Sequence, residues 1–269
     1  MSLVISSALV LADVADGLSL DHPIIGWHNV VAPSTIVATA ENTSYPASNL
    51  ANPATHLKWL GTSTGEQYLT VTTNYVDEID YVAVAGHNWQ TAEIPVSVEG
   101  YIGGIWTEIV EEVMLPNDGP AIFRFEAQSL SQVRIRLQAG SEIPQAAVVY
   151  VGKLLVVERK IYAGHTPMPH ARKVTVANGR SESGNFLGRI VLGSRRETTI
   201  PLSLISPDWY RDYMDEFLEA AKDTPFFFGW RPQTYPRECG YGWLLDDPAP
   251  TPTGPSNLIA FDLKVGGVA

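Results

Sequence analysis

Short stretches of alternating apolar and polar residues run through the first half of the chain. In residues 132–137, Val, Ile and Leu alternate with Gln and two Arg. This period of two is typical of a β-strand that buries one face and exposes the other. Turn-forming clusters such as residues 116–120 separate these stretches. The pattern predicts a β-sandwich or jelly roll with strands at 66–73, 80–85, 94–99, 106–113, 121–125, 132–137 and 146–157.

The second half combines further strands with one amphipathic helix. Ser206, Pro207 and Asp208 provide an N-cap, a proline suited to the first turn and an acid at the positive end of the helix dipole. An apolar stripe follows, made of Trp209, Tyr210, Tyr213, Met214, Phe217, Leu218 and Ala221. We therefore expect a helix over 207–224 that lies on a sheet and ends before Pro225. The strands expected around it are 173–177, 187–192, 198–204, 226–230, 240–244 and 258–265, with a proline-rich loop at 248–255.

Charge divides the chain into two regions. Residues 1–150 hold 4 Lys or Arg and 16 Asp or Glu, whereas residues 151–269 hold 14 and 13. A run of Gly and Pro within 162–170 marks the joint. The predicted fold is mainly β. Its parts are an N-terminal segment (1–35) with a strand at 3–11 that packs on either domain, a jelly-roll sandwich (36–162), and a β-barrel or sandwich domain with one packed helix (163–269).

Composition narrows the range of functions. A net charge of -11 and a pI near 4.9 argue against a protein that coats phosphate backbones, since such proteins bind through Lys and Arg. The single cysteine, Cys239, excludes an internal disulfide and a cysteine-ligated zinc site. The longest apolar run, 146–157, is shorter than the roughly 20 residues that span a bilayer, so we expect no membrane span and synthesis in the cytoplasm. The charged fraction of 17% is low, which fits a subunit covered by neighbours.

One resemblance to a known family covers most of the first region. Tyr-Pro-Ala-Ser-Asn-Leu at 45–50, followed by residues 52–59, resembles the opening of discoidin-type (galactose-binding-like) jelly rolls. Segments at 68–71, 96–100, 105–109 and 132–137 continue the same order, so the resemblance covers roughly residues 40–157. It implies a jelly roll whose end loops bind sugars, lipid head groups or protein surfaces. Asn-Pro-Ala at 52–54 stands where many members have the Asp-Gly turn of a calcium loop, which puts a calcium site in doubt.

A second resemblance concerns residues 76–89, which read Val-Asp-Glu-Ile-Asp-Tyr-Val-Ala-Val-Ala-Gly-His-Asn-Trp. This phrase resembles a recurrent feature of tail proteins in long-tailed bacteriophages and prophages. The second region is similar to the tail-tube-like domain of distal tail and baseplate-hub proteins. The resemblance implies a homo-oligomeric ring, expected to be a hexamer, that contacts other phage tail proteins in the virion tail and meets DNA only as passing cargo. Here the jelly roll comes first, whereas the familiar distal tail protein begins with its tube-like domain.

A cluster of aromatic and polar residues is the candidate glycan surface. Its members are His87, Asn88, Trp89 and Trp106. An indole can stack on a sugar ring while His and Asn bond its hydroxyls. The alternative, in which Trp89 packs under the sandwich and its polar neighbours cap strand ends, is the favoured interpretation because most such clusters are structural.

A hairpin over residues 173–204 is the candidate assembly element, because hairpins can extend a neighbour's sheet. Its candidate contact residues are Arg180, Ser181, Glu182, Arg195 and Arg196. Six copies of the acidic first region would repel one another if they were close. Residues 163–269 alone are therefore expected to form rings, and residues 36–162 to stay monomeric.

No metal site, cofactor or catalytic group is expected. Asp77, Glu78 and Asp80 lack a glycine-centred loop, and the spacing of His165 and His170 fits neither a zinc finger nor a His-Glu-x-x-His helix. We interpret the chain as a non-enzyme that forms a ring-shaped adaptor between tail tube and baseplate. The alternative is a carbohydrate-binding module that attaches a virion or an enzyme to a cell-surface glycan.

Overall fold

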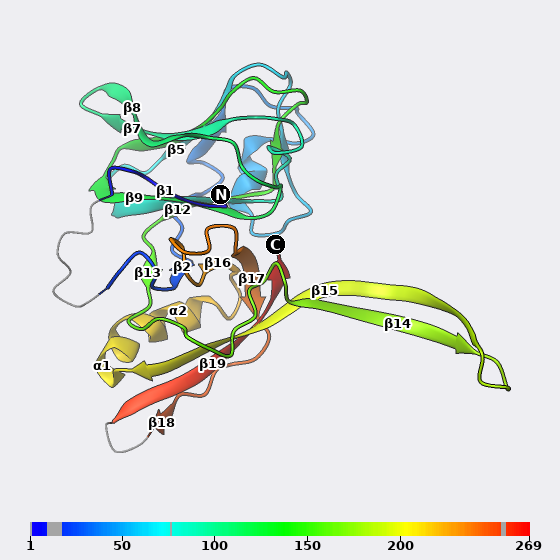
Figure 1. Cartoon of the computed structure of the whole chain (residues 1–269). Coiled ribbons are helices and arrows are strands. Elements are labelled where there is room, and N and C mark those ends of the chain that lie inside the picture. The colour runs from blue at the N-terminus through cyan, green and yellow to red at the C-terminus, as the bar shows by residue number, and fades with distance from the viewer. Residues whose placement is uncertain (1, 10–17, 76, 254–256) are drawn as a thin grey trace.

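Two β-rich units lie side by side, and one long hairpin projects away from them (Figure 1). The computed structural model describes residues 2–9, 18–75, 77–253 and 257–269. Strands dominate these residues, and the helical segments are short, which confirms the predicted mainly β class. Within the same ranges, no helix has the length and apolar character needed to cross a membrane.

The first unit is a two-sheet sandwich, as the alternating pattern predicted. One sheet has the order β1 (Leu3–Ile5), β9 (Ala121–Ser129), β6 (Glu78–Ala85) and β12 (Val148–Gly152). The other has the order β3 (Ile36–Ala38), β5 (Gln67–Thr72), β10 (Gln132–Leu137), β7 (Val96–Ile102) and β8 (Ile105–Val113). A 3-10 turn, η1 (Ala47–Ala51), and the pair β4 (Trp59–Leu60) and β11 (Gln145–Ala146) complete the unit. The inward-facing apolar side chains of both sheets form one core.

The second unit is a sheet that draws strands from three parts of the chain. Its order is β13 (Leu155–Val156), β2 (Ile24–Gly26), β16 (Phe226–Gly229), β17 (Cys239–Leu244), β19 (Leu258–Val268), β15 (Phe186–Ile205) and β14 (Arg172–Arg180), with β18 (Thr251–Thr253) paired to β19. Because β2 lies between β13 and β16, the N-terminal segment completes this sheet. Residues 163–269 alone would therefore lack two strands, β2 and β13, of the sheet to which they belong.

The predicted helix forms, but it is shorter and less regular than expected. It consists of α1 (Pro207–Trp209), a π-helical turn η2 (Tyr210–Met214) and α2 (Asp215–Ala220). The Ser206 side chain accepts a hydrogen bond from the backbone N–H of Trp209, as an N-cap should. The helix ends at residue 220 rather than 224. Met214 and Phe217 are buried against the sheet, whereas Tyr213, a predicted member of the stripe, is 55% exposed in the π-helical turn.

Three other predicted boundaries change. The apolar run 146–157 divides into β12 in the sandwich and β13 in the second sheet. The predicted strands 187–192 and 198–204 are parts of one continuous strand, β15. The N-terminal strand covers Leu3–Ile5, where it pairs parallel with β9 of the sandwich. Residues 10–11 of its predicted span, and 254–255 of the proline-rich loop, lie outside the described residues, as does Val76.

Buried tyrosines connect the two units. Tyr81 on β6 and Tyr150 on β12 point from the sandwich into an apolar layer that also contains Phe227 and Tyr241 of the second sheet. Each hydroxyl finds a carbonyl partner: Tyr81 donates to His28 at 2.6 Å, Tyr150 to Pro225 at 3.0 Å and Tyr241 to Pro53 at 2.7 Å. Buried polar groups of this kind are costly unless they are paired. The paired hydroxyls and the apolar layer together hold the units as one body.

Gly152, at the end of β12, allows the chain to pass close to the segment after β2. A Cβ atom at this position would lie 2.2 Å from the backbone oxygen of His28. We predict that Gly152→Ala lowers the free energy of unfolding by about 1–3 kcal/mol, the usual cost of overpacking. Chemical denaturation measures the change. Gly65→Ala is the control, because a Cβ there meets only the Ser63 side chain at 3.7 Å; equal effects of the two variants would contradict the prediction.

Candidate functional site

The hairpin of β14 and β15 forms an arm, defined here as residues 172–196, that leaves the body of the molecule (Figure 1). β14 and the part of β15 that pairs with it contact each other but contain no buried residue. A turn at 181–185 closes the tip, where Gly184 adopts a φ of 86° and the Ser181 hydroxyl accepts a bond from the Asn185 N–H. At about 3.3 Å per residue, nine-residue β14 spans roughly 30 Å.

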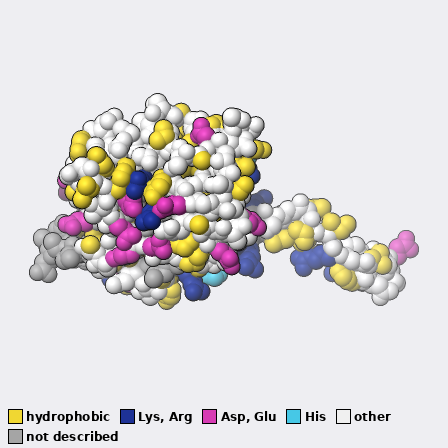
Figure 2. Space-filling view, turned by 90° about the horizontal axis from the view of Figure 1, so that it is seen from above, with side chains coloured by type: hydrophobic (Ala, Val, Ile, Leu, Met, Phe, Trp, Pro, Cys, Tyr) yellow, Lys and Arg dark blue, Asp and Glu magenta, His cyan; other side chains and the backbone are white. Residues whose placement is uncertain are grey.

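The arm exposes apolar side chains together with basic ones. Six of its large hydrophobic residues are exposed: Val174, Phe186, Leu187, Ile190, Val191 and Leu192. The arm also holds 6 Lys or Arg residues against one acid, Glu182, which lies in the tip turn. Figure 2 shows hydrophobic and basic side chains along the arm and acidic side chains spread over the body. A concentration of exposed apolar side chains on one element is typical of an interaction site.

The predicted assembly residues fall at the two ends of the arm. Arg180, Ser181 and Glu182 lie at its tip, and Arg195 and Arg196 lie at its base. At the base, Lys173 and Arg195 both pair with Glu197, and Arg196 donates to the carbonyl of Pro169. The basal residues therefore attach the arm to the body, whereas the tip residues are open to a partner.

Two members of the proposed glycan cluster, His87 and Trp89, lie in the interior. Trp89 is fully buried and His87 is 4% exposed, and their rings stack with centroids 4.7 Å apart. Asn88 donates through its side chain to the carbonyl of Ile143 and accepts from the N–H of Gln145. No ring face of Trp89 is available to a sugar, so stacking on Trp89 is excluded. The structural interpretation of this loop, with Trp89 packed under the sandwich, describes what is seen.

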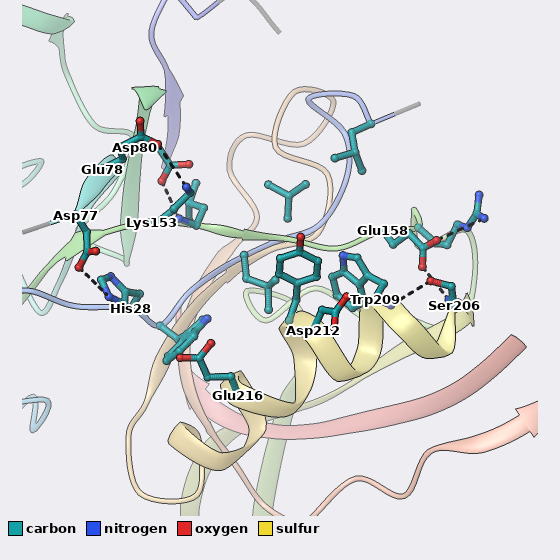
Figure 3. Close-up of a pocket in the computed structure, with 17 residues that line it drawn as sticks. His28, Asp77, Glu78, Asp80, Lys153, Glu158, Ser206, Trp209, Asp212 and Glu216 are labelled. Carbon is teal, nitrogen blue, oxygen red and sulfur yellow. Dashed lines mark hydrogen bonds and ion pairs between the residues drawn. The ribbon is translucent and has the colours of Figure 1, made fainter. Parts of the chain in front are cut away.

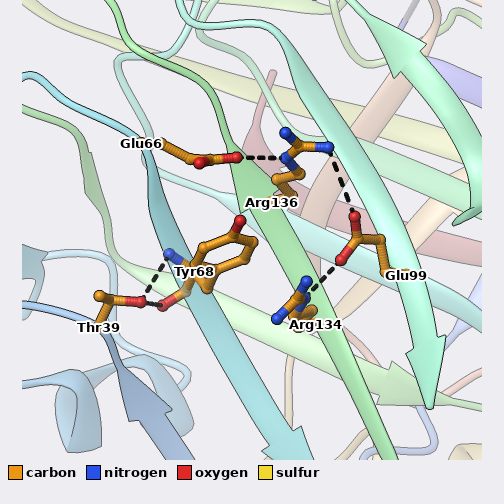
Figure 4. Close-up of polar contacts among 6 residues, drawn as sticks. All are labelled: Thr39, Glu66, Tyr68, Glu99, Arg134 and Arg136. Atoms are coloured by element: carbon orange, nitrogen blue, oxygen red, sulfur yellow. Dashed lines mark hydrogen bonds and ion pairs between the residues drawn. The ribbon is translucent and has the colours of Figure 1, made fainter. Parts of the chain in front are cut away.

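Trp106 is partly exposed, and an arginine lies over its ring. The Arg134 guanidinium lies between the rings of Tyr68, 4.0 Å away, and Trp106, 4.1 Å away. Arg134 also donates to buried Glu99 at 2.5 Å, and Glu99 lies 3.7 Å from Arg136 (Figure 4). Such a network orders the outer face of the sheet. The Arg134 guanidinium therefore covers the face of Trp106 over which it lies.

A groove that the sequence did not indicate runs between the helix and the sandwich. Its volume is about 1040 Å³. Aromatic residues Trp27, Trp209 and Tyr213 and acidic residues Asp77, Glu78, Asp80, Glu158, Asp212 and Glu216 line it, as Figure 3 shows in part. These residues are far apart in sequence, and only the packing of the two units brings them together. The exposed position of Tyr213 within an otherwise apolar stripe is the one feature of the groove that differs from the sequence pattern.

Part of the acidic lining is already paired. Asp77 lies 3.9 Å from His28, Glu78 lies 3.5 Å from Lys153, and Glu158 lies 3.7 Å from Arg159. Asp80 accepts a hydrogen bond from the N–H of Leu154 at 2.7 Å, and burial raises its pKa to about 6. Among the described residues, Asp212 and Glu216 have no cationic partner within ion-pair distance. Those two carboxylates on the helix are free to bind a cation.

The described ranges of the chain contain no group of three or more His, Cys, Asp or Glu side chains arranged to hold a metal ion. The His165 Nδ1–H donates to the carbonyl of Thr199, and the His170 Nε2 lies 3.4 Å from the Glu238 carboxylate, so the two histidines have separate partners. Cys239 is buried, and burial raises the pKa of its thiol far above the usual range. A buried thiol of this kind is chemically inert.

Neither a protein-family model nor a curated protein sequence matches the chain. Similar solved structures include chitosan-binding module 1 of a chitosanase/glucanase from Paenibacillus sp. IK-5, with 14% identity, 47% of this chain and 98% of that chain covered, and a TM-score of 0.41. The module CpGH89CBM32-5 from Clostridium perfringens, in complex with GalNAc-β-1,3-galactose, is 14% identical. The match covers 44% of this chain and 93% of that chain, with a TM-score of 0.39. The CBM32 of AlyQ, in complex with 4,5-unsaturated mannuronic acid, is 16% identical. The match covers 46% of this chain and 95% of that chain, with a TM-score of 0.37. These neighbours are carbohydrate-binding modules, and the likeness concerns the fold alone.

His87 gives the interior loop a pH-dependent stability. Its Nε2 donates to the carbonyl of Gly119 at 2.8 Å, and burial lowers its pKa from 6.5 to about 4. Between pH 6.5 and about 4, the His87 imidazole is mostly protonated in the unfolded chain and mostly neutral in the folded chain. The contribution of His87 to the free energy of unfolding therefore falls as the pH falls through this window. The free energy of unfolding should fall between pH 7 and pH 4.5 in the wild type. We predict that this fall is smaller by roughly 2 kcal/mol in His87→Gln.

Thermal or chemical unfolding at several pH values measures this difference. Comparing the variant with the wild type at each pH cancels the opposite contribution of Asp80, whose raised pKa favours the folded state at low pH. Parallel stability curves for the two proteins would contradict the assignment.

Proposed function

We propose that the protein is a structural subunit that assembles with copies of itself through the arm, as a ring-forming adaptor of a phage tail tip. The observation that carries the proposal is the arm: 25 residues that contact no other part of the fold except at their base, with six large hydrophobic side chains exposed. Such a segment contributes little to the stability of its own body. Its apolar surface is better explained by a partner that covers it.

The geometry of the arm favours a repeating contact. One edge of β14 has no strand paired to it within the described residues, so its backbone groups are available to a neighbouring strand. The arm also projects from one side of the body only (Figure 1). A projection on one side that meets a different surface on the next copy makes a head-to-tail contact, and such contacts form a ring when the rotation between copies closes and an open filament when it does not.

The phage assignment rests on the resemblance of residues 76–89 and of the second unit to tail proteins. None of the three similar structures described above is a tail protein. We therefore keep the location in the virion tail, the contacts with other tail proteins and the hexameric stoichiometry as parts of the proposal. The absence of enzymatic activity is likewise proposed rather than observed.

Shortening the arm tests the proposal. We predict that removing residues 177–190 and joining Val176 to Val191, which are partners across the hairpin, through an Asn-Gly turn abolishes self-assembly. None of the deleted residues is buried, so the thermal transition of the body should stay unchanged. Analytical ultracentrifugation measures the assembly, and electron microscopy of the wild type should show closed rings. A wild type that stays monomeric at high concentration would overturn the proposal, as would a shortened protein that still assembles.

A second function, carbohydrate binding by the sandwich, keeps one specific observation in its favour. Tyr45 is 40% exposed, and the Lys58 ammonium lies over its ring at 5.5 Å beside the Gln145 side chain, to which it donates at 2.7 Å. An exposed aromatic ring with adjacent polar groups is a common sugar-binding arrangement. The similar modules bind chitosan and GalNAc-β-1,3-galactose according to their descriptions, which makes these sugars the natural probes.

Titration calorimetry with chitosan oligosaccharides and GalNAc-β-1,3-galactose tests this second function. If the sandwich binds either sugar, Tyr45→Ala should weaken binding by roughly tenfold or more, since one lost stacking contact costs about 1–2 kcal/mol. Tyr162→Ala is the matched control, because Tyr162 is also exposed and has Arg231 over its ring at 5.7 Å. Equal affinity of the two variants, or no binding by the wild type, would remove carbohydrate binding at Tyr45.

A further inference from the structure

Charge is divided between the arm and the rest of the protein. The arm carries 6 Lys or Arg and one acid, whereas the other residues carry 12 Lys or Arg and 28 Asp or Glu. A basic and apolar segment therefore extends from an acidic body. A second copy of the same chain offers the opposite charge that this segment needs.

We propose that the arm of one copy lies in the acidic aromatic groove beside the helix of a second copy. The proposal deepens the assembly function above and rests on it, because it names the surface that receives the arm. The arm and the groove lie on opposite sides of the body: β14 and β15 project from one side, and α1 lies on the other (Figure 1). One copy therefore presents its arm outward on one side and its groove on the other, as a head-to-tail ring requires.

The groove has the chemistry to hold arginine side chains. Asp212 and Glu216 follow each other one turn apart on the helix and lack ion-pair partners within the described residues. Trp209 and Tyr213 lie on the same stretch of helix, with ring centroids 6.0 Å apart, and Tyr213 is 55% exposed. A guanidinium beside these residues would gain a carboxylate and an aromatic face together.

The arm has the complementary chemistry. Arg180 and Arg189 lie in its distal half and form no ion pair with any described residue. Phe186, Ile190 and Leu192 lie close to them in the hairpin and are exposed by 66–67%. These side chains would cover the apolar wall of the groove, which includes Trp27, Leu155 and Val156.

A charge exchange tests the proposal on the full-length chain. Asp212→Lys with Glu216→Lys should raise the dissociation constant of assembly by roughly tenfold or more, since close interfacial charge pairs carry coupling energies of that size. Arg180→Glu with Arg189→Glu should have the same effect. A protein with all four substitutions carries reversed but complementary surfaces and should recover assembly. Sedimentation velocity over a concentration series measures each dissociation constant.

A matched control separates local from overall charge. Glu126→Lys with Glu142→Lys makes the same change in net charge at two exposed positions of the sandwich, and assembly should be unchanged. A cysteine pair adds a second readout. In the proposed contact, Glu216→Cys with Arg189→Cys should form intermolecular disulfides. The native Cys239 is buried and therefore does not compete. Mass spectrometry of the linked peptides identifies the pairing.

The outcomes distinguish the two proposals. If the wild type assembles and the shortened arm abolishes assembly, but the groove substitutions have no effect, the groove assignment is wrong and the assembly function stands. If the wild type does not assemble, both are wrong. Binding of chitosan oligosaccharides that is lost in Asp212→Lys with Glu216→Lys, without a change in assembly, would overturn the arm as occupant and assign the groove to a cationic sugar.

Discussion

The apolar layer between the two β units fixes the positions of everything else in the molecule. Tyr81 and Tyr150 from the sandwich and Tyr241 from the second sheet fill it, and each donates its hydroxyl to a carbonyl at the junction. A loose linker would let the units move independently. Here the shared core and the paired hydroxyls make them one body, so the arm and the groove keep a defined relation to each other.

This constraint explains why the groove exists. Most of its carboxylates come from the start of β6 and from the helix, which belong to different units, and only the junction brings them together. The arm, in contrast, lies outside the shared core of the two units. The acidic pair Asp212 and Glu216 is thus held apart from the basic pair Arg180 and Arg189 within one copy. In the proposed assembly, the two pairs meet between neighbouring copies.

Local patterns predicted much of this fold, and non-local contacts produced the rest. Residues 132–137 form β10 with the predicted bounds, because strict alternation specifies one buried face. The run 146–157 divides between two sheets after Gly152, which lies against the backbone of His28, a residue far away in the sequence. Trp89 was correctly expected inside. Trp106 was predicted to be a free aromatic residue. Its contact with Arg134 depends on strand pairing, which the local sequence does not specify. The groove residues could not be grouped from sequence because two units supply them.

Hydrogen exchange of the full-length protein, followed by mass spectrometry at increasing protein concentration, tests the central claim most directly. Backbone amides report which segments become covered on assembly. The account predicts that peptides from the arm, 172–196, and from the helix, 207–220, gain protection together as concentration rises, while sandwich peptides away from the groove residues 77–80 and 153 do not change. Protection confined to sandwich loops, or an arm that exchanges equally fast at every concentration, would contradict it.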